Sequence, residues 1–351
     1  MFEKFKQNKY FYLTLITIFL ASSYIGAHYG DAFKPQDEYA LIKDYLLNDS
    51  PLYGFNRPKI WIHTKYEYNA RKWKSFQSRS SQDLNQPYIH LTIKTIIDHC
   101  GDDFHICLID DNTFSKLIPS WKETNLATVA EPMKSQLRQI GLAELVYYYG
   151  GMVLPNSFVC GRPLKPFYES AIAGNQPFVC QNINRNENLL KNPQRQPFLP
   201  ETYIMGAPKN NETVKELVEY LKKRNKTPHF SSDRDFLGDT SQWCMNAIRE
   251  QKMTLIGGEY VGVKTVKGKP VLLDDLMEET YLDLHVDCVG VYIPENELLS
   301  RKRYQWFAVM PTDELMNTNM FITRYMKTAL VDGSKDLYSN PTTEQRSVTS
   351  I

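Results

Sequence analysis

The sequence lacks the short motifs that identify several large enzyme classes. It contains neither G-x-x-x-x-G-K-[ST] nor G-x-G-x-x-G, so the glycine-rich loops with which many proteins hold phosphate groups are absent. It also contains no H-E-x-x-H and no G-x-S-x-G. These absences argue against a zinc protease and against an ordinary α/β-hydrolase.

The sequence also lacks an excess of charge of one sign. It has 41 basic and 40 acidic residues, and no basic stripe or tail stands out. Binding to nucleic acid depends on positive charge that faces the phosphates. The sequence therefore predicts no nucleic-acid partner.

Cysteines are few, and none is close to another in sequence. No two of them form a C-x-x-C pair, so the usual spacing of a zinc site is missing. In an oxidising compartment one or two disulfides are expected, and elsewhere buried free thiols; the sequence leaves both open. The six are Cys100, Cys107, Cys160, Cys180, Cys244 and Cys288.

The N-terminal segment contains a long stretch without charge. Residues 1–9 include three lysines, and residues 10–30 contain no Asp, Glu, Lys or Arg. About 20 helical residues cross a hydrocarbon core of about 30 Å. We expect 10–30 to be a transmembrane anchor, with 1–9 cytoplasmic and the rest lumenal or extracytoplasmic, as in a single-pass type II membrane protein. A cleaved signal peptide is the alternative.

Composition divides the rest of the chain into three parts. Residues 31–57 are polar and contain proline, which predicts a stem. Residues 58–331 contain the periodic apolar segments of a folded domain. Residues 332–351 are polar and rich in Ser and Thr, which predicts a flexible tail.

Apolar patterns at the start of the folded domain predict an α/β fold. A buried strand at 59–64, a helix at 86–100 and a second buried strand at 102–111 form a parallel βαβ unit. A helix at 134–149 and a short strand at 152–154 follow. We expect a mixed sheet flanked by helices. Further strands are predicted at 178–180, 202–205 and 304–310, and further helices at 212–225, 242–251 and 318–330.

Four features of this region follow one another in a fixed order. They are Pro58-Lys-Ile-Trp-Ile-His63, Leu108-Ile-Asp-Asp111, Tyr147-Tyr-Tyr-Gly-Gly151 and the apolar Met152-Val-Leu154. Over residues 58–165 the chain resembles the glycosyltransferase family that includes capsular polysaccharide synthesis proteins and DxD-type, mannosyltransferase-like enzymes. The resemblance implies a GT-A fold, in which a Rossmann-like half binds a nucleotide sugar at the carboxyl ends of its strands.

The resemblance also implies a set of residues that bind the nucleotide sugar. His63 follows the first strand, although a histidine there is often structural. Asp110 and Asp111 end the second strand, where acids also serve in ordinary turns. The full set that we predict is Trp61, Ile62, His63, Asp110, Asp111, Arg138, Gly150, Gly151, Asn156 and Ser157.

On the helix before Gly150 the chain departs from the family. The family has an Asp and an Arg there, and the corresponding positions of this sequence hold Gln139 and Leu142. Arg138 lies one helical turn before Leu142, so we expect it on a similar face.

The chain departs from the family at the metal-binding motif. Where the family has Asp-x-Asp, this sequence has Pro155, Asn156 and Ser157, so no carboxylate remains to hold a cation against the donor diphosphate. We predict no metal at this motif, and Mn²⁺ or Mg²⁺ only if its ligands lie elsewhere. The side chains that could contact the diphosphate instead are Arg138, Ser157, Arg162 and Lys165.

The acceptor side is expected in a polar segment at 229–239. It is predicted to be a loop, and it contains three acids that could act in catalysis: Asp233, Asp235 and Asp239. An exposed turn without a catalytic role is the alternative.

Two functions are consistent with these features. In the first, a membrane-anchored glycosyltransferase moves a hexose from a nucleotide sugar to a glycan or glycoconjugate, without a metal ion. In the second, the fold persists without catalysis, and the protein binds glycans or serves as a structural or assembly subunit.

Overall fold

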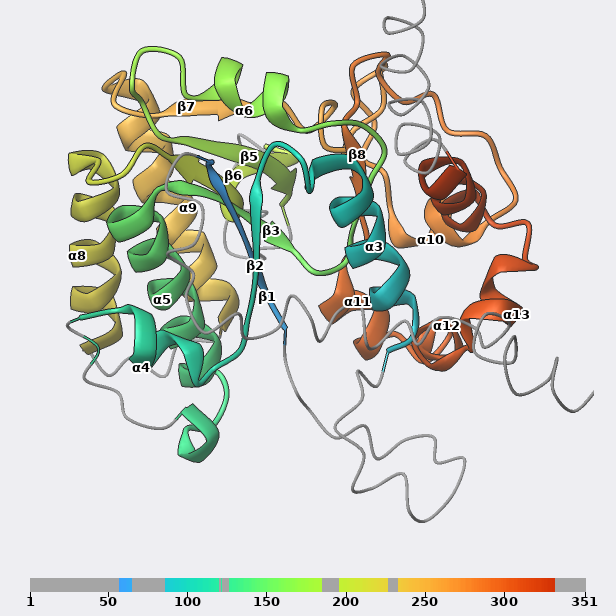
Figure 1. Ribbon diagram of the computed structural model, residues 1–351, viewed down its shortest axis with the longest axis horizontal. Helices are drawn as coiled ribbons and strands as arrows, with labels where there is room; N and C mark the ends of the chain where they lie inside the picture. The colour runs from blue at the N-terminus through green and yellow to red at the C-terminus, as the bar shows by residue number, and fades with distance from the viewer. Residues whose placement is uncertain are drawn as a thin grey trace, which may run out of the picture. The chain divides into compact units, whose positions relative to one another are not determined.

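The structure is a computed structural model that describes residues 57–64, 86–119, 121, 126–184, 196–226 and 233–331 (Figure 1). The predicted anchor at 10–30 and the predicted tail at 332–351 lie outside the described residues, as does all of the predicted stem except residue 57. Within these ranges, no helix has the length and hydropathy that crossing a membrane requires.

The main sheet has six strands in the order β2-β1-β3-β6-β5-β7. β1 is parallel to both β2 and β3, whereas β6 is antiparallel to its neighbours β3 and β5. β7 is parallel to β5, so β6 alone runs against the others. The strands are β1 (Lys59–His63), β2 (His105–Ile109), β3 (Gly151–Pro155), β5 (Phe178–Ile183), β6 (Phe198–Ala207) and β7 (Thr254–Ile256). The predicted mixed sheet is confirmed.

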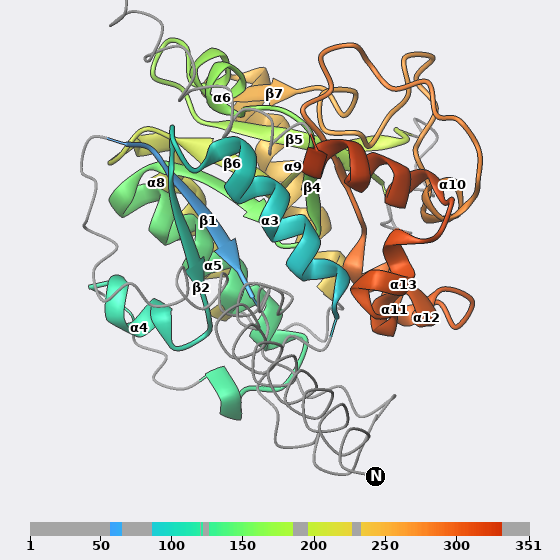
Figure 2. The same ribbon diagram turned by 45° about the vertical axis from the view of Figure 1, so that its right-hand side comes forward.

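Helices cover both faces of this sheet. α5 (Met133–Tyr149), α8 (Glu212–Lys226) and α9 (Asp233–Arg249) lie on one face, and α3 (Tyr88–Cys100) lies on the other (Figures 1 and 2). The first face buries a large apolar cluster, in which Trp61 packs with residues of β3, β6 and the three helices. Because neighbouring side chains of a strand alternate between faces, Ile60 and Ile62 point to the α3 side.

A second, two-stranded sheet belongs to the C-terminal part of the described chain. β4 (Phe158–Cys160) pairs antiparallel with β8 (Gly290–Tyr292). The rest of this part consists mostly of short helices and a longer one at residues 321–331. The remaining helices are α4 (Thr113–Leu117), η2 (Leu126–Thr128), α6 (Lys165–Ala171), α10 (Leu273–Met277), α11 (Glu295–Ser300), α12 (Gln305–Val309) and α13 (Thr312–Met316).

The predicted strand at 304–310 is wrong, since most of this segment is the helix α12. Tyr304, Phe307 and Ala308 are buried, while Trp306 is 42% exposed. Burial at positions i, i+3 and i+4 is the spacing of a helix. A short apolar run does not by itself distinguish a strand from a buried helix.

The Gly150-Gly151 pair makes the turn from α5 into β3. Both residues have positive φ, 71° and 93°, which other residues rarely adopt. A Cβ atom on Gly151 would lie 2.2 Å from the carbonyl oxygen of Lys59. Glycine is therefore required here so that β3 can pair closely with β1.

Candidate functional site

The carboxyl edge of β1, β2 and β3 is the ligand position that this topology predicts. From β1 the chain passes through α3 to β2 on one side, and then through α5 to β3 on the other. The helices of these two connections lie on opposite faces (Figures 1 and 2). The edge between β1 and β3 is therefore a topological switch point, where open α/β sheets bind ligands. His63 of β1 and Pro155 of β3 face each other there.

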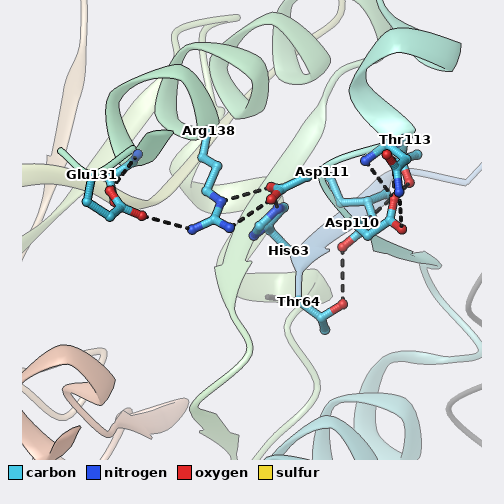
Figure 3. A network of polar contacts seen from close by, with 10 residues as sticks. His63, Thr64, Asp110, Asp111, Thr113, Glu131 and Arg138 are labelled. Atoms are coloured by element: carbon cyan, nitrogen blue, oxygen red, sulfur yellow. Dashed lines mark hydrogen bonds and ion pairs between the residues drawn. The ribbon is translucent and has the colours of Figure 1, made fainter. Parts of the chain in front are cut away.

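At this edge, Asp111 is held by two cationic or titratable side chains from different elements (Figure 3). Arg138 of α5 donates from Nε to Oδ1 at 2.8 Å and from Nη2 to Oδ2 at 2.7 Å. His63 Nε2 lies 2.9 Å from the same Oδ1. A planar guanidinium binding both carboxylate oxygens is a strong and directional arrangement. It fixes the carboxylate of Asp111 at the end of the sheet.

The surroundings of this network strengthen it. The side chains of His63 and Arg138 are 8% and 7% exposed, and that of Asp111 is 24% exposed. The His63 ring stacks on Phe114 at 5.5 Å between centroids. Glu131 lies 3.4 Å from Arg138 Nη1. Burial alone would raise the pKa of Asp111, but the hydrogen bonds from Arg138 and His63 outweigh it and lower this pKa well below its usual range.

Asp110 has a local structural role. Its Oδ1 accepts from the backbone N–H of Asn112 at 3.0 Å and from that of Thr113 at 2.9 Å. It also accepts from the Thr113 hydroxyl at 2.7 Å. These bonds organise the turn that leads into α4, which agrees with the alternative that acids at strand ends serve in turns. A contact with a nucleoside stays a prediction for this residue.

Four other predicted residues are buried or act through their backbone. Trp61 and Ile62 have no exposed surface. The indole Nε1 of Trp61 donates to the carbonyl oxygen of Gly150 at 3.0 Å, which ties β1 to the end of α5. Gly150 and Gly151 shape the entry into β3. The structure thus places Trp61 and Ile62 in the interior of the sheet. It places Gly150 and Gly151 at the opposite edge from His63, beside Lys59 at the start of β1, so their predicted contact with a nucleotide sugar is not supported by this placement.

Asn156 and Ser157, at the position of the family's acids, form a buried turn between β3 and β4. Asn156 is 5% exposed and Ser157 is 1% exposed. The Ser157 hydroxyl donates to the carbonyl oxygen of Ile293 at 2.7 Å, and the carbonyl oxygen of Asn156 accepts from Thr92. Both residues therefore connect β3 to α3 and to the C-terminal part of the chain.

The predicted acceptor segment is partly helical. The loop predicted at 229–239 is wrong from Asp233 onwards, because α9 begins there. Acids favour the first turn of a helix, where they face its positive end, so their clustering fits a helix start. Asp239 forms an ion pair with Arg224 of α8. The side chains of Asp233 and Asp235 lie outside the described part, and their catalytic role stays a prediction.

Lys165 lies at the opposite edge of the sheet from His63. Its Nζ is 3.0 Å from Oδ1 of Asp103, which precedes β2. The chain reverses direction at Asn156 and Ser157. Strand β4 then runs back to the amino edge of the sheet, where β1, β2 and β3 begin. A ligand at the carboxyl edge therefore does not reach Lys165, and Arg162, just after β4, follows the same path away. The predicted contact between Lys165 and a diphosphate is not supported.

Two polar contacts at the start of β6 were not identified from the sequence. Because β6 runs in reverse, its first residues lie at the same edge as the carboxyl ends of β3 and β5. Gln139 Nε2 donates to the Thr202 hydroxyl at 2.6 Å, and Asn182 Nδ2 donates to Glu201 Oε2 at 2.7 Å. The sequence signal for these contacts is Gln139, which stands where the resembled family has an Asp on this helix.

Metal ligands do not gather anywhere in the described ranges. No group of three or more His, Cys, Asp or Glu side chains is placed there to hold an ion. Asp111 is engaged by Arg138 and His63, and Glu201 by Asn182. At the edge, the described residues thus offer polar and ionic groups without a cation site.

Comparisons with known proteins give structural neighbours only. No protein family matches the sequence, and no curated protein is similar to it. One solved structure that is similar is the glycosyltransferase GlyE of Streptococcus pneumoniae TIGR4, with 10% identity and a TM-score of 0.38; the match covers 82% of this chain and 64% of that one. The chain thus spans less than two thirds of GlyE.

Two further neighbours are also described as transferases. The galactosyltransferase LgtC, in complex with donor and acceptor sugar analogues, has 8% identity, a TM-score of 0.38 and coverage of 77% and 95%. The PaToxG glycosyltransferase has 13% identity, a TM-score of 0.31 and coverage of 60% and 78%. TM-scores below 0.5 do not establish a common fold.

Proposed function

We propose that this protein is a glycosyltransferase of the GT-A type that binds a nucleotide sugar at the carboxyl edge of β1, β2 and β3. The proposal has two supports. One is the ordered set of motifs that resembles the DxD-type and capsular polysaccharide synthesis family. The other is that His63 and Asp111 of this set meet Arg138 of α5 at the switch point of the sheet.

The His63–Asp111–Arg138 network is the observation that carries the proposal. A carboxylate that is fixed by an arginine and a histidine from other elements is pre-organised, so it loses little freedom when it accepts hydrogen bonds from a ligand. Its remaining exposure, 24% of the side chain, leaves part of it accessible. Asp111 would accept from the hydroxyl or N–H groups of the nucleoside.

In this proposal the transferase works without a divalent ion. Asn156 and Ser157 are neutral, buried and bonded to the framework, so they do not supply ligands to a cation. The diphosphate would be met by backbone N–H groups and by polar side chains at the ends of β1 and β3. The transferred sugar would be a hexose, and the acceptor a glycan or glycoconjugate.

Glu201 is the carboxylate that we assign to the acceptor. It lies at the same edge as His63, on the strand next to β3, and Asn182 orients it. An oriented carboxylate can take the proton of an attacking hydroxyl group. Asp239, by contrast, is engaged by Arg224 between α8 and α9.

A second candidate is a protein of this fold without catalysis, which binds glycans or assembles with others at a membrane. One observation favours it: the position of the family's metal ligands has become a buried structural turn. In both cases we propose that residues 10–30 anchor the chain in a membrane and that the domain lies on the lumenal or extracytoplasmic side.

Calorimetry with the full chain in detergent tests the proposal. UDP-sugars and GDP-sugars would each be titrated with Mn²⁺ and with EDTA, into the wild type, Asp111→Asn and the opposite-edge control Lys165→Ala. We expect saturable binding in EDTA that Asp111→Asn weakens at least tenfold and Lys165→Ala leaves unchanged. Binding that needs Mn²⁺ would contradict the metal-free mechanism. Absence of binding by a folded wild type would favour the second candidate and lead to glycan arrays.

A further inference from the structure

A pair of cysteines joins α3 to β4 on the side of the sheet away from α5. Cys100 ends α3 and Cys160 ends β4, and they are 1% and 0% exposed. Their Sγ atoms are 3.8 Å apart, although 60 residues separate them in sequence. All six cysteines are in the described ranges, and the structure shows no other pair of them with sulfurs in contact.

The surroundings of this pair hold the two backbones in place. The backbone N–H of Cys160 donates to the hydroxyl of Thr95, one turn before Cys100 on α3. β4 is in turn paired with β8, where Cys160 faces Gly290. A disulfide needs a sulfur–sulfur distance of about 2.05 Å, so the two sulfurs must approach by roughly 1.8 Å. Rotation about the Cα–Cβ bonds can move each sulfur by that amount.

We propose that Cys100 and Cys160 are a disulfide-forming pair, closed by exchange with a small-molecule or protein disulfide. The thiolate of one cysteine attacks the oxidant disulfide and displaces one thiol, which leaves a mixed disulfide. The second cysteine attacks the protein sulfur of that bond and displaces the other thiol. The two protons end on the released thiols, and the two electrons reduce the oxidant.

Closure occurs while the chain folds or opens locally. In the folded protein both sulfurs are shielded, and burial together with the neighbouring Cys100 thiol raises the pKa of Cys160 well above its usual value. Little thiolate is therefore available for attack by an oxidant from solvent. Because both sulfurs are buried, the bond, once formed, is also shielded from reductants. The proposal is independent of the proposed transferase activity.

Disulfide mapping of the full chain tests the inference. The protein in detergent would be unfolded with a reductant in urea, refolded in a mixture of oxidised and reduced glutathione, quenched in acid, alkylated and digested without reduction. We expect one dominant cross-linked peptide pair that contains Cys100 and Cys160, 2 Da lighter than the sum of its parts. The disulfide should raise the melting temperature of the intact protein by roughly 5–10 °C over that of the reduced protein.

Variants and alternative products decide the result. Cys107→Ser, at a cysteine without a sulfur neighbour, should keep the cross-link, and Cys100→Ser should remove it. Cys288 is the competing partner, because it precedes Gly290, the residue opposite Cys160, by two positions. A dominant Cys160–Cys288 bond, or glutathione attached to Cys100 and Cys160 separately, would overturn the inference. So would full alkylation of both cysteines in the wild type, which needs no variant to fold.

Discussion

Arg138 donates two hydrogen bonds to the carboxylate of Asp111, from Nε to Oδ1 at 2.8 Å and from Nη2 to Oδ2 at 2.7 Å. The two residues are 27 positions apart, one on the helix α5 and one after the strand β2. Their contact fixes the first turns of α5 over the carboxyl edge of the sheet.

Arg138→Ala should destabilise the protein by about 1–3 kcal/mol, because it leaves the partly buried carboxylate of Asp111 without its main partner. Urea unfolding at pH 7 would measure the change. Lys165→Ala removes an exposed ion pair at the opposite edge and should leave the midpoint unchanged. Equal midpoints for Arg138→Ala and the wild type would show that the pair adds no stability.

Stability should fall in acid partly because of Asp111. Its pKa is lowered in the folded protein relative to about 3.8, so the unfolded chain takes up the proton first as pH decreases. The stabilisation is therefore complete above about pH 5 and is lost progressively below it, as pH falls toward the lowered folded value. Unfolding free energies from pH 7 to pH 2 should decline less steeply in Asp111→Asn. Parallel curves for the two proteins would exclude this contribution.

Restoring an acid of the family motif should not create a metal site. In Ser157→Asp, the carboxylate would face the carbonyl oxygen of Ile293 in a position that is 1% exposed. We expect a loss of about 2–4 kcal/mol in stability and no binding of Mn²⁺ by calorimetry. The milder control Ser157→Ala should lose about 1 kcal/mol with its hydrogen bond. Stoichiometric Mn²⁺ binding to a folded Ser157→Asp variant would mean that the turn opens toward the site.

Gly151→Ala should be far more damaging than Gly174→Ala. Both glycines have positive φ, 93° and 80°, so the backbone strain is similar. Only at Gly151 does the added Cβ meet another atom, the carbonyl oxygen of Lys59 at 2.2 Å; at Gly174 nothing lies within 4 Å. We expect a loss of about 1–2 kcal/mol at Gly174 and of roughly 3 kcal/mol or more at Gly151, measured by thermal unfolding. Similar losses would show that β1 and β3 separate readily.

Glu201→Gln should reduce transfer to the acceptor at least about 100-fold, if the proposed transferase activity holds, because the amide cannot take the proton of the attacking hydroxyl. Its donor affinity should stay within about twofold, since the donor lies over β1 and β3. Product formation and calorimetry would separate the two effects. Glu212→Gln, at the exposed start of α8, is the matched control and should leave both unchanged. Full activity of Glu201→Gln would remove this residue from the proposal.

The first half of the domain is predictable because its signals are local. The apolar run at Lys59–His63, the periodic helix that ends at Cys100 and the Gly-Gly stop after Tyr149 each specify an element within a few residues. The prediction of a strand at 304–310 is wrong because this apolar segment is too short for its hydrophobic spacing to distinguish a helix from a strand. The pattern at the start of α9 predicts a loop because a cluster of aspartates occurs both in turns and in first helical turns.

The site was predictable in its members but not in their roles. The ordered motifs indicate His63 and Asp111, and the helical position of Arg138 places it on a similar face to the family's arginine. The pairing of Asp111 with Arg138 depends on how α5 packs beside β2, which no local pattern encodes. The burial of Ser157 depends on Ile293, 136 residues away. The place of Glu201 in the site depends on the reversed direction of β6. Because β6 is antiparallel to β3 and β5, the first residues of β6 lie at the edge where those two strands end.

Arg138 and Gln139 are consecutive on α5, yet one reaches Asp111 after β2 and the other reaches Thr202 on β6. Consecutive helical side chains point about 100° apart, so a single turn can extend to two sides. β2 and β6 are not neighbours in the sheet, because β1 and β3 lie between them. The amino end of α5 therefore contacts both sides of the carboxyl edge of β1 and β3 at once. A ligand that bound between these two sides would therefore contact groups whose positions both depend on the same helical turn.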